Sequence, residues 1–126
     1  DGIVFHRVID GFMAQTGDVQ FGNMKKGFDA QRAGTGQSTK PNLPAEFSSI
    51  PFGRGVVGMA RSADPNSGNS QFFIMFAPGY FLNGQYTVVG QVVSGMDAVD
   101  KIKRGVGESG AVSNPDRMLK VTIEQR

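Results

Sequence analysis

The apolar residues of this chain fall into short runs, and this spacing restricts the fold more than any other feature. Each run is only a few residues long and is bounded by Gly, Pro, Asn or Ser. Such runs are typical of β-strands and are too short for the helices of a bundle. We therefore predict a mainly β fold. The segments predicted as strands are residues 3–9, 12–16, 56–61, 71–77, 86–93 and 118–124.

The first two strands form a predicted hairpin, "IVFHRVIDGFMAQ", with its turn at Asp10-Gly11. Asp-Gly between alternating apolar residues is a strong hairpin signal, because glycine accepts the positive φ that tight turns need. Two polar residues, His6 and Arg7, lie inside the first strand, and Gln15 closes the second. A guanidinium among so many apolar side chains indicates either a functional cation or an ordinary snorkelling arginine.

One helix is predicted in "SGMDAVDKIKRG", residues 94–105. Ser94 can cap its first turn, with Asp97 three residues later, and Gly105 can end it. The segment between strands, residues 17–51, is rich in Gly, Lys and Pro and has no strong periodicity. Segments of this length are usually functional or mobile.

Composition limits the classes of function. A length of 126 residues suits one hydrophobic core, so we predict a single domain over residues 1–126. The formal charge of +2 is too small to indicate nucleic acid or a membrane surface as a partner. The absence of cysteine excludes disulfides, thiolate catalysis and zinc–thiolate sites. No run approaches the length of a membrane span, and the first residues do not resemble a signal peptide.

Three segments suggest other chemistries, and each lacks a required partner. His6 could be a general base, but without a neighbouring nucleophile or carboxylate a packed, hydrogen-bonded structural histidine is favoured. "DPNSGNSQF" starts like a calcium loop at Asp64, but Gly68 stands where an oxygen ligand is needed. "GTG" at 34–36 is followed by Pro41 rather than a helix, which is weak support for phosphate binding. We predict neither a metal nor a cofactor.

Strand alternation separates two faces of the segment 71–77. One face is wholly apolar and is predicted to line the interior of a barrel or sandwich. The other combines an amide with apolar side chains, as in a binding groove. Residues 12–16 repeat this combination and Arg7 adds a cation, although half-exposed strands with a snorkelling Arg7 are the alternative. The interior face carries Phe72, Ile74 and Phe76, and the groove face carries Gln71, Phe73 and Met75.

Three longer motifs resemble the cyclophilin family of peptidyl-prolyl cis–trans isomerases. They are "FHRVIDGFMAQTGD", "GMARSADPNSGNSQFFI" and "FLNGQYTVVGQVVSGMDAVDKI", in the order that the family has them. The resemblance implies a closed eight-stranded antiparallel β-barrel capped by two helices. The family's first two strands and first helix have no counterpart here, so we expect an N-terminally incomplete domain.

The resemblance also implies roles for individual residues. Arg7 of "FHR" would be the catalytic residue, and Gln15 and Gln71 would orient Arg7 and the substrate backbone. Ala60 and Arg61 of "MAR" would present main-chain groups to the peptide. One residue more than in the animal pattern follows this motif, which leaves the alignment after Arg61 open. The other predicted substrate-binding residues are Phe12, Met13, Phe73, Phe81, Leu82 and Tyr86.

Two positions depart from the family's common pattern. Phe81 stands where many eukaryotic members have Trp, which removes an indole N–H donor. Binding of cyclosporin-type cyclic peptides is therefore expected to be weak. Tyr86 stands where many members have His, which replaces one flat wall by another.

The implied function is acceleration of rotation about X-Pro bonds in proline-containing polypeptides, which assists protein folding. The motif "ARSADPNS" resembles bacterial rather than animal members of the family. We expect a cytoplasmic monomer, or a periplasmic one if a signal peptide has been removed. Two alternatives stay open from the sequence. One is a proline-peptide binding or chaperone module that does not catalyse exchange. The other is a scaffold that binds a partner through residues 17–51.

Overall fold

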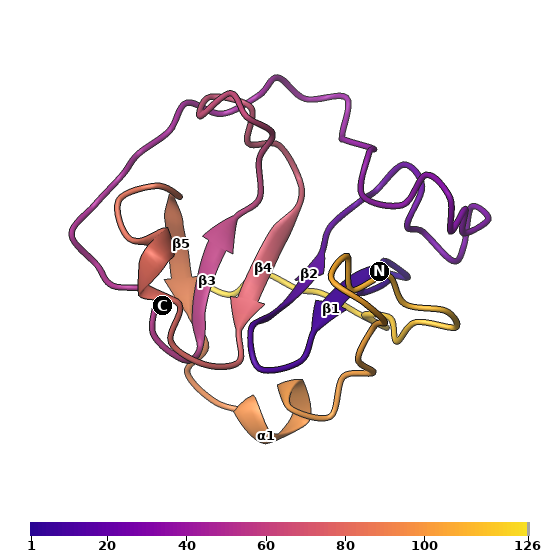
Figure 1. The fold of residues 1–126 in the computed structure, drawn as a ribbon. Helices are drawn as coiled ribbons and strands as arrows, with labels where there is room; N and C mark the ends of the chain where they lie inside the picture. Colours follow the sequence, from indigo (N-terminus) through magenta and orange to yellow (C-terminus); the bar gives the residue numbers. More distant parts are fainter. Residues whose placement is uncertain (126) are drawn as a thin grey trace.

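A computed structural model describes residues 1–125 and shows a five-stranded antiparallel sheet (Figure 1). The strand order is β1-β2-β4-β3-β5, so β1 and β5 are the edge strands. The mainly β prediction is confirmed. The strands are β1 Arg7–Ile9, β2 Met13–Thr16, β3 Val56–Met59, β4 Phe72–Met75 and β5 Val88–Gln91, with a 3-10 turn η1 Tyr80–Leu82 and a helix α1 Met96–Val99.

The predicted hairpin is present, and its turn follows from the Asp10-Gly11 pair. Gly11 has a φ of 73°, and the Phe12 amide donates to the Ile9 carbonyl at 3.0 Å. The first strand is shorter than predicted, because residues 3 and 4 make only isolated bridges to Asn23 and Arg117.

The prediction of a strand over 118–124 is wrong for the described residues. The Met118 amide donates to the Ile3 carbonyl at 2.9 Å, but strand pairing does not continue beyond it. The Val121 amide instead donates to the Asp1 carboxylate at 2.7 Å. A segment becomes a strand only where a neighbour accepts its backbone hydrogen bonds, and none of residues 1–125 lies in register there.

The sheet does not close on itself within residues 1–125. The closed eight-stranded barrel expected from the resemblance is therefore not formed by the described part of the chain. Closure needs strand partners for both β1 and β5. β5 pairs with a strand on one side only, and the outer edge of β1 is bound by the irregular chain near Ala111 rather than by a strand.

The helix is shorter than predicted and has a different cap. Its N-cap is Gly95, in the left-handed region at φ 88°, rather than Ser94, and no side chain caps the first turn. The helix ends at Val99 with Asp100 as its C-cap, and the backbone a few residues later is bound by tertiary partners. The Lys103 amide donates to the Asp116 carboxylate at 2.8 Å, and the Gly105 amide donates to the Val8 carbonyl at 2.8 Å.

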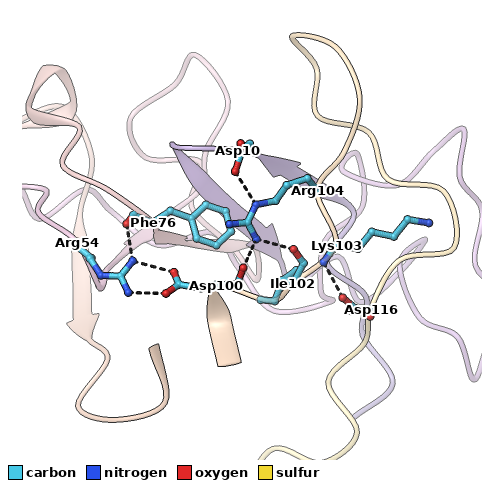
Figure 2. A network of polar contacts seen from close by, with 8 residues as sticks. All are labelled: Asp10, Arg54, Phe76, Asp100, Ile102, Lys103, Arg104 and Asp116. Atoms are coloured by element: carbon cyan, nitrogen blue, oxygen red, sulfur yellow. Dashed lines mark hydrogen bonds and ion pairs between the residues drawn. The ribbon is translucent and has the colours of Figure 1, made fainter. Parts of the chain in front are cut away.

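Two arginines join this helical segment to the sheet, as Figure 2 shows. Arg54 makes two hydrogen bonds to Asp100, of 2.8 and 2.7 Å, and a third to the Phe76 carbonyl at 2.9 Å. Arg104 lies over the Phe76 ring at 3.9 Å and donates to Asp10 at 3.0 Å. Exposed ion pairs contribute little to stability, so their effect here is to fix the position of the helix.

The two faces of the sheet support separate hydrophobic cores. The predicted alternation along 71–77 is confirmed, and Phe76 is buried as predicted, but the face predicted to line a groove is also buried. Phe73 and Met75 are buried because Phe52 and η1 cover their face, whereas Phe72 and Ile74 are only half-buried. The first core contains Met13, Phe52, Val56, Phe73, Met75 and Leu82, and the second contains Phe5, Val8, Ala14, Phe76 and Val112.

A single buried carboxylate organises the first part of the long segment after β2. Asp18 Oδ1 accepts hydrogen bonds from the Gln20 and Phe21 amides at 3.0 and 2.9 Å. Its Oδ2 accepts from the Gly34 and Gly36 amides at 2.7 and 2.9 Å. Burial by itself would raise the pKa of Asp18, but the four N–H groups favour the carboxylate and hold the pKa below its ordinary value of 3.8.

We expect Asp18 to make the free energy of unfolding depend on pH in acid. Because its folded-state pKa is lowered, its stabilisation is present above 3.8 and is lost as the pH falls through the folded-state pKa. Asp18→Asn turns an N–H donor toward backbone N–H groups and should cost about 2 kcal/mol at neutral pH. Urea unfolding across the acid range measures both effects. An unchanged acid dependence in the variant would contradict the assignment.

Candidate active site

The strand register places four residues in one row across the sheet. Arg7 on β1 lies opposite Gln15 on β2, and Gln15 lies opposite Phe73 on β4. Phe73 in turn lies opposite Gly58 on β3. Directly opposed residues point to the same face, so a cation, an amide and an aromatic ring stand side by side.

Gly58 leaves the space that the aromatic ring of this row occupies. A Cβ atom on Gly58 would lie 2.4 Å from Cζ of Phe73 and 2.8 Å from Cε1 of Phe52. The two rings stack with their centroids 5.9 Å apart. A strand glycine at such a point marks a close approach, here of a ring to the backbone.

The row opens into a cleft of about 580 Å³. Its floor is apolar and buried, formed by Met13, Phe73 and Leu82. Its rim is more exposed, with Phe81 at 72%. Ten of the eleven predicted site residues line it, namely Arg7, Phe12, Met13, Gln15, Ala60, Arg61, Phe73, Phe81, Leu82 and Tyr86.

Aromatic contacts shape the walls of the cleft. Tyr86 meets Phe73 edge to face, with centroids 5.8 Å apart and planes at 86°. Phe12 and Phe81 lie 5.5 Å apart at the other side. Edge-to-face and tilted pairs are favoured geometries, so these walls are held by their own packing.

Arg7 is held at two points beside this apolar floor. Its Nε donates to the Ser109 carbonyl at 3.0 Å, and its Nη1 donates to Gln15 Oε1 at 3.2 Å. Nη2 has no hydrogen-bond acceptor among the residues that the structure describes. The side chain is half-buried and anchored, which favours a fixed cation over a freely snorkelling one. Its catalytic role stays a prediction.

The two glutamines are linked to each other as well as to Arg7. Gln15 Nε2 donates to Gln71 Oε1 at 3.0 Å, and Gln71 Nε2 donates to the Gly34 and Gly36 carbonyls, both at 3.0 Å. Gln71 is the one predicted residue outside the cleft. It lines an adjoining polar pocket of about 340 Å³.

The predicted main-chain role of Ala60 and Arg61 stays a prediction. The Ala60 amide donates to the Gln71 carbonyl at 3.0 Å within the sheet, which leaves the carbonyl of Ala60 and the main chain of Arg61 for the predicted role. Arg61 contributes its side chain as well, because the guanidinium stacks on the Tyr86 ring at 4.5 Å and donates to the Gln85 carbonyl at 2.7 Å. No pattern in the sequence predicts this stack.

His6 also lines the cleft, and the expected hydrogen bonds are missing. The ring is buried at 6% exposure, and neither nitrogen has a hydrogen-bond partner in the described part of the chain. Burial lowers its pKa below the ordinary 6.5, although nearby Asp18 opposes the shift. The prediction of a packed histidine is confirmed, whereas that of a hydrogen-bonded one is wrong.

Sequence reasoning missed the residues that enclose the cleft beside His6. They come from the segment containing "GTG" and from the chain after α1, which no strand pattern predicts. The sequence feature that could have indicated them is the glycine at position 34. Its φ of 99° favours glycine, and an added Cβ would lie 3.2 Å from His6 Nε2. The missed residues are Ala33, Gly34, Thr35, Ser109 and Ala111.

Residues 1–125 contain no group of three or more His, Cys, Asp or Glu side chains placed to hold a metal ion. Within the same residues, no helix has the length and apolar character needed to cross a membrane.

The family model described as cyclophilin type peptidyl-prolyl cis-trans isomerase/CLD matches residues 1–123. This chain belongs to the cyclophilin family. A probable peptidyl-prolyl cis-trans isomerase of Brucella abortus (strain 2308) is 74% identical over 125 residues, covering 98% of this chain and 64% of that protein. A peptidyl-prolyl cis-trans isomerase of Acinetobacter baylyi is 40% identical over 108 residues, covering 81% of this chain and 52% of that protein. The chain thus spans less than two thirds of these relatives.

Solved cyclophilins share the fold. A cyclophilin from Hirschia baltica matches with a TM-score of 0.71 at 26% identity, covering 93% of this chain and 57% of that one. A cyclophilin type isomerase from Cryptosporidium parvum, crystallised in the presence of the dipeptide Ala-Pro, matches with a TM-score of 0.77 at 22% identity. That match covers 100% of this chain and 77% of the other. The fold family predicted from the three motifs is confirmed.

A substitution at Gly58 tests whether the row of opposed residues across the sheet of this cyclophilin chain depends on the glycine. Gly58→Ala should push the Phe73 ring out of place and cost about 1–3 kcal/mol by overpacking. Gly90→Ala is the matched control, because a Cβ at Gly90 on the neighbouring strand meets nothing within 4 Å. Urea unfolding and the aromatic NMR signals of Phe73 measure the effect. Equal stability of the two variants would show that the row does not depend on Gly58.

Proposed function

We propose that the protein containing this chain is a peptidyl-prolyl cis–trans isomerase. One observation carries the proposal: Arg7 is held by hydrogen bonds of 3.0 and 3.2 Å beside a cleft with a buried apolar floor. Membership of the cyclophilin family and the names of the curated relatives support it.

The reaction requires little covalent chemistry from the protein. Resonance in an X-Pro amide sets a rotational barrier of about 18–20 kcal/mol, and no bond is broken when the amide turns. A twisted amide localises a lone pair on the prolyl nitrogen, which then accepts a hydrogen bond. A donor that acts mainly in that state lowers the barrier without holding the planar substrate more tightly.

Arg7 suits this donor role. Its guanidinium is permanently charged and planar, and two of its nitrogens are already bound by Ser109 and Gln15. The apolar floor takes the prolyl ring and excludes water, which strengthens the hydrogen bond from Arg7. A rate increase of about five powers of ten needs roughly 7 kcal/mol, within reach of one charged hydrogen bond plus positioning.

The substrates that fit this cleft are proline-containing polypeptides. The Cryptosporidium relative was crystallised in the presence of Ala-Pro, which is consistent with this choice. Phe81 at the exposed rim has no N–H to donate, so weak binding of cyclosporin-type peptides is part of the proposal. The monomeric state and the cytoplasmic location stay predictions.

Arg7→Ala should lower kcat/KM at least about 100-fold, because it removes a donor used in the transition state, while the fold remains intact. Arg32→Ala is the matched control, since Arg32 is exposed and lies outside the cleft. NMR exchange spectroscopy on an X-Pro peptide measures turnover, and circular dichroism checks the fold. Near-normal turnover in a folded Arg7→Ala protein would refute the role of Arg7. Peptide binding without faster exchange in the unsubstituted protein would favour the binding module.

We further propose that the sheet is completed to a closed eight-stranded barrel in the whole protein. Leu119, Val121 and Ile123 alternate along the C-terminal segment and are 73%, 54% and 94% exposed. Alternating apolar residues of this kind suit a strand with one buried face. Among the described residues, no strand pairs with the outer edge of β5, and the curated relatives are longer than this chain.

Barrel closure can be followed by amide hydrogen exchange. Fusing the N-terminal region of the Brucella relative to this chain should slow exchange along β5 and residues 118–124, because new strands would bind those amides. Amides of β4 serve as the internal control, since both of its neighbours are already present. Unchanged exchange along β5 and 118–124 in the folded fusion would contradict closure.

A further inference from the structure

A continuous chain of hydrogen bonds joins a buried carboxylate to the candidate catalytic arginine. It runs from Asp18 through the backbone of Gly34 and Gly36 to the Gln71 amide, then to the Gln15 amide and Arg7. We call this set the positioning chain. Asp18 lies outside the cleft and outside the adjoining pocket. No step of the proposed reaction needs it for contact with the peptide.

The positioning chain has a direction that is set at the loop. Gln71 Nε2 donates to two carbonyl oxygens at 3.0 Å each, so Gln71 must turn its own oxygen toward Gln15. Gln15 then donates its Nε2 to that oxygen and turns Oε1 toward Arg7. If either amide were reversed, an N–H donor would face the next donor or the guanidinium. The loop carbonyls therefore decide whether Arg7 meets an acceptor.

Asp18 holds the two glycines whose carbonyls Gln71 binds; it binds their N–H groups, and the carbonyls lie in the peptide units that directly follow. Its Oδ2 binds the Gly34 and Gly36 amides at 2.7 and 2.9 Å, while Oδ1 binds the chain at Gln20 and Phe21. The fit is close, because a Cβ on Gly36 would lie 2.1 Å from Asp18 Oδ1. A charged acceptor of four amides is a strong and geometrically specific anchor.

We propose that Asp18 is a positioning residue for Arg7, acting through Gly34, Gly36, Gln71 and Gln15. The inference rests on the proposed function only for its effect on turnover. Without the carboxylate, the two carbonyls are no longer held at Gln71, both glutamine amides are free to turn, and Arg7 loses the acceptor that fixes Nη1. If Asp18 only stabilised the loop, the effect of removing its carboxylate on turnover would not depend on the presence of Gln15.

A double-mutant cycle separates these two roles. Asp18→Asn should lower kcat/KM about tenfold, mostly through kcat, because Arg7 acts in the transition state. In a Gln15→Leu background, which already cuts the positioning chain, Asp18→Asn should cause little further loss. Asp29→Asn is the matched control, since Asp29 also accepts two loop amides, at 3.1 and 3.3 Å, but belongs to neither pocket. An equal loss from Asp18→Asn in both backgrounds would overturn the proposal.

A second readout does not depend on turnover. The NMR signals of the Gln15 side-chain amide and of the Arg7 guanidinium should shift in Asp18→Asn and not in Asp29→Asn. If these signals stay in place in Asp18→Asn, the proposal fails whatever the activity. If the unsubstituted protein does not accelerate exchange, the proposed function fails, and the signals alone decide the role of Asp18. Should Asp18→Asn not fold, Gln71→Leu cuts the same chain, and unmoved Arg7 signals there refute the proposal.

Discussion

The antiparallel register of β1, β2, β4 and β3 is the constraint on which the site depends. It aligns Arg7, Gln15, Phe73 and Gly58 in one row, although they are far apart in the sequence. Because side chains alternate along a strand, a shift of one residue in any pairing would turn a member of the row to the other face. The tight Asp10-Gly11 turn and the rings packed around Gly58 oppose such a shift.

Around this row, apolar packing and polar anchoring serve different purposes. The buried floor gives a peptide a dry surface, and the aromatic walls hold one another in place. The polar contacts fix direction instead, because Ser109, Gln15 and the loop beyond Asp18 leave Arg7 little freedom. A cation used as a hydrogen-bond donor in a transition state must be placed before the substrate arrives, since its reorganisation would add to the barrier.

Local chemistry made much of this arrangement predictable from the sequence. The Asp10-Gly11 turn predicted the hairpin, and alternation predicted which residues of 71–77 share a face. Ten of the cleft residues were predicted by the resemblance of three motifs to the cyclophilin family. What failed depended on tertiary partners. Phe73 is buried by Phe52 from a distant segment, the helix ends at Val99 instead of reaching Gly105, whose amide binds Val8, and residues 118–124 lack a strand neighbour. No local pattern carries such information.

The central claim is that Arg7, held in place beside the apolar floor of the cleft, donates a hydrogen bond to the X-Pro amide as it rotates. A crystal structure of the protein with a bound X-Pro peptide tests it most directly. The account predicts the prolyl ring against Met13, Phe73 and Leu82, with the Arg7 guanidinium within about 3 Å of the imide nitrogen or the preceding carbonyl. A proline bound outside this cleft, or Arg7 turned away with no rotamer able to reach the peptide bond, would contradict it.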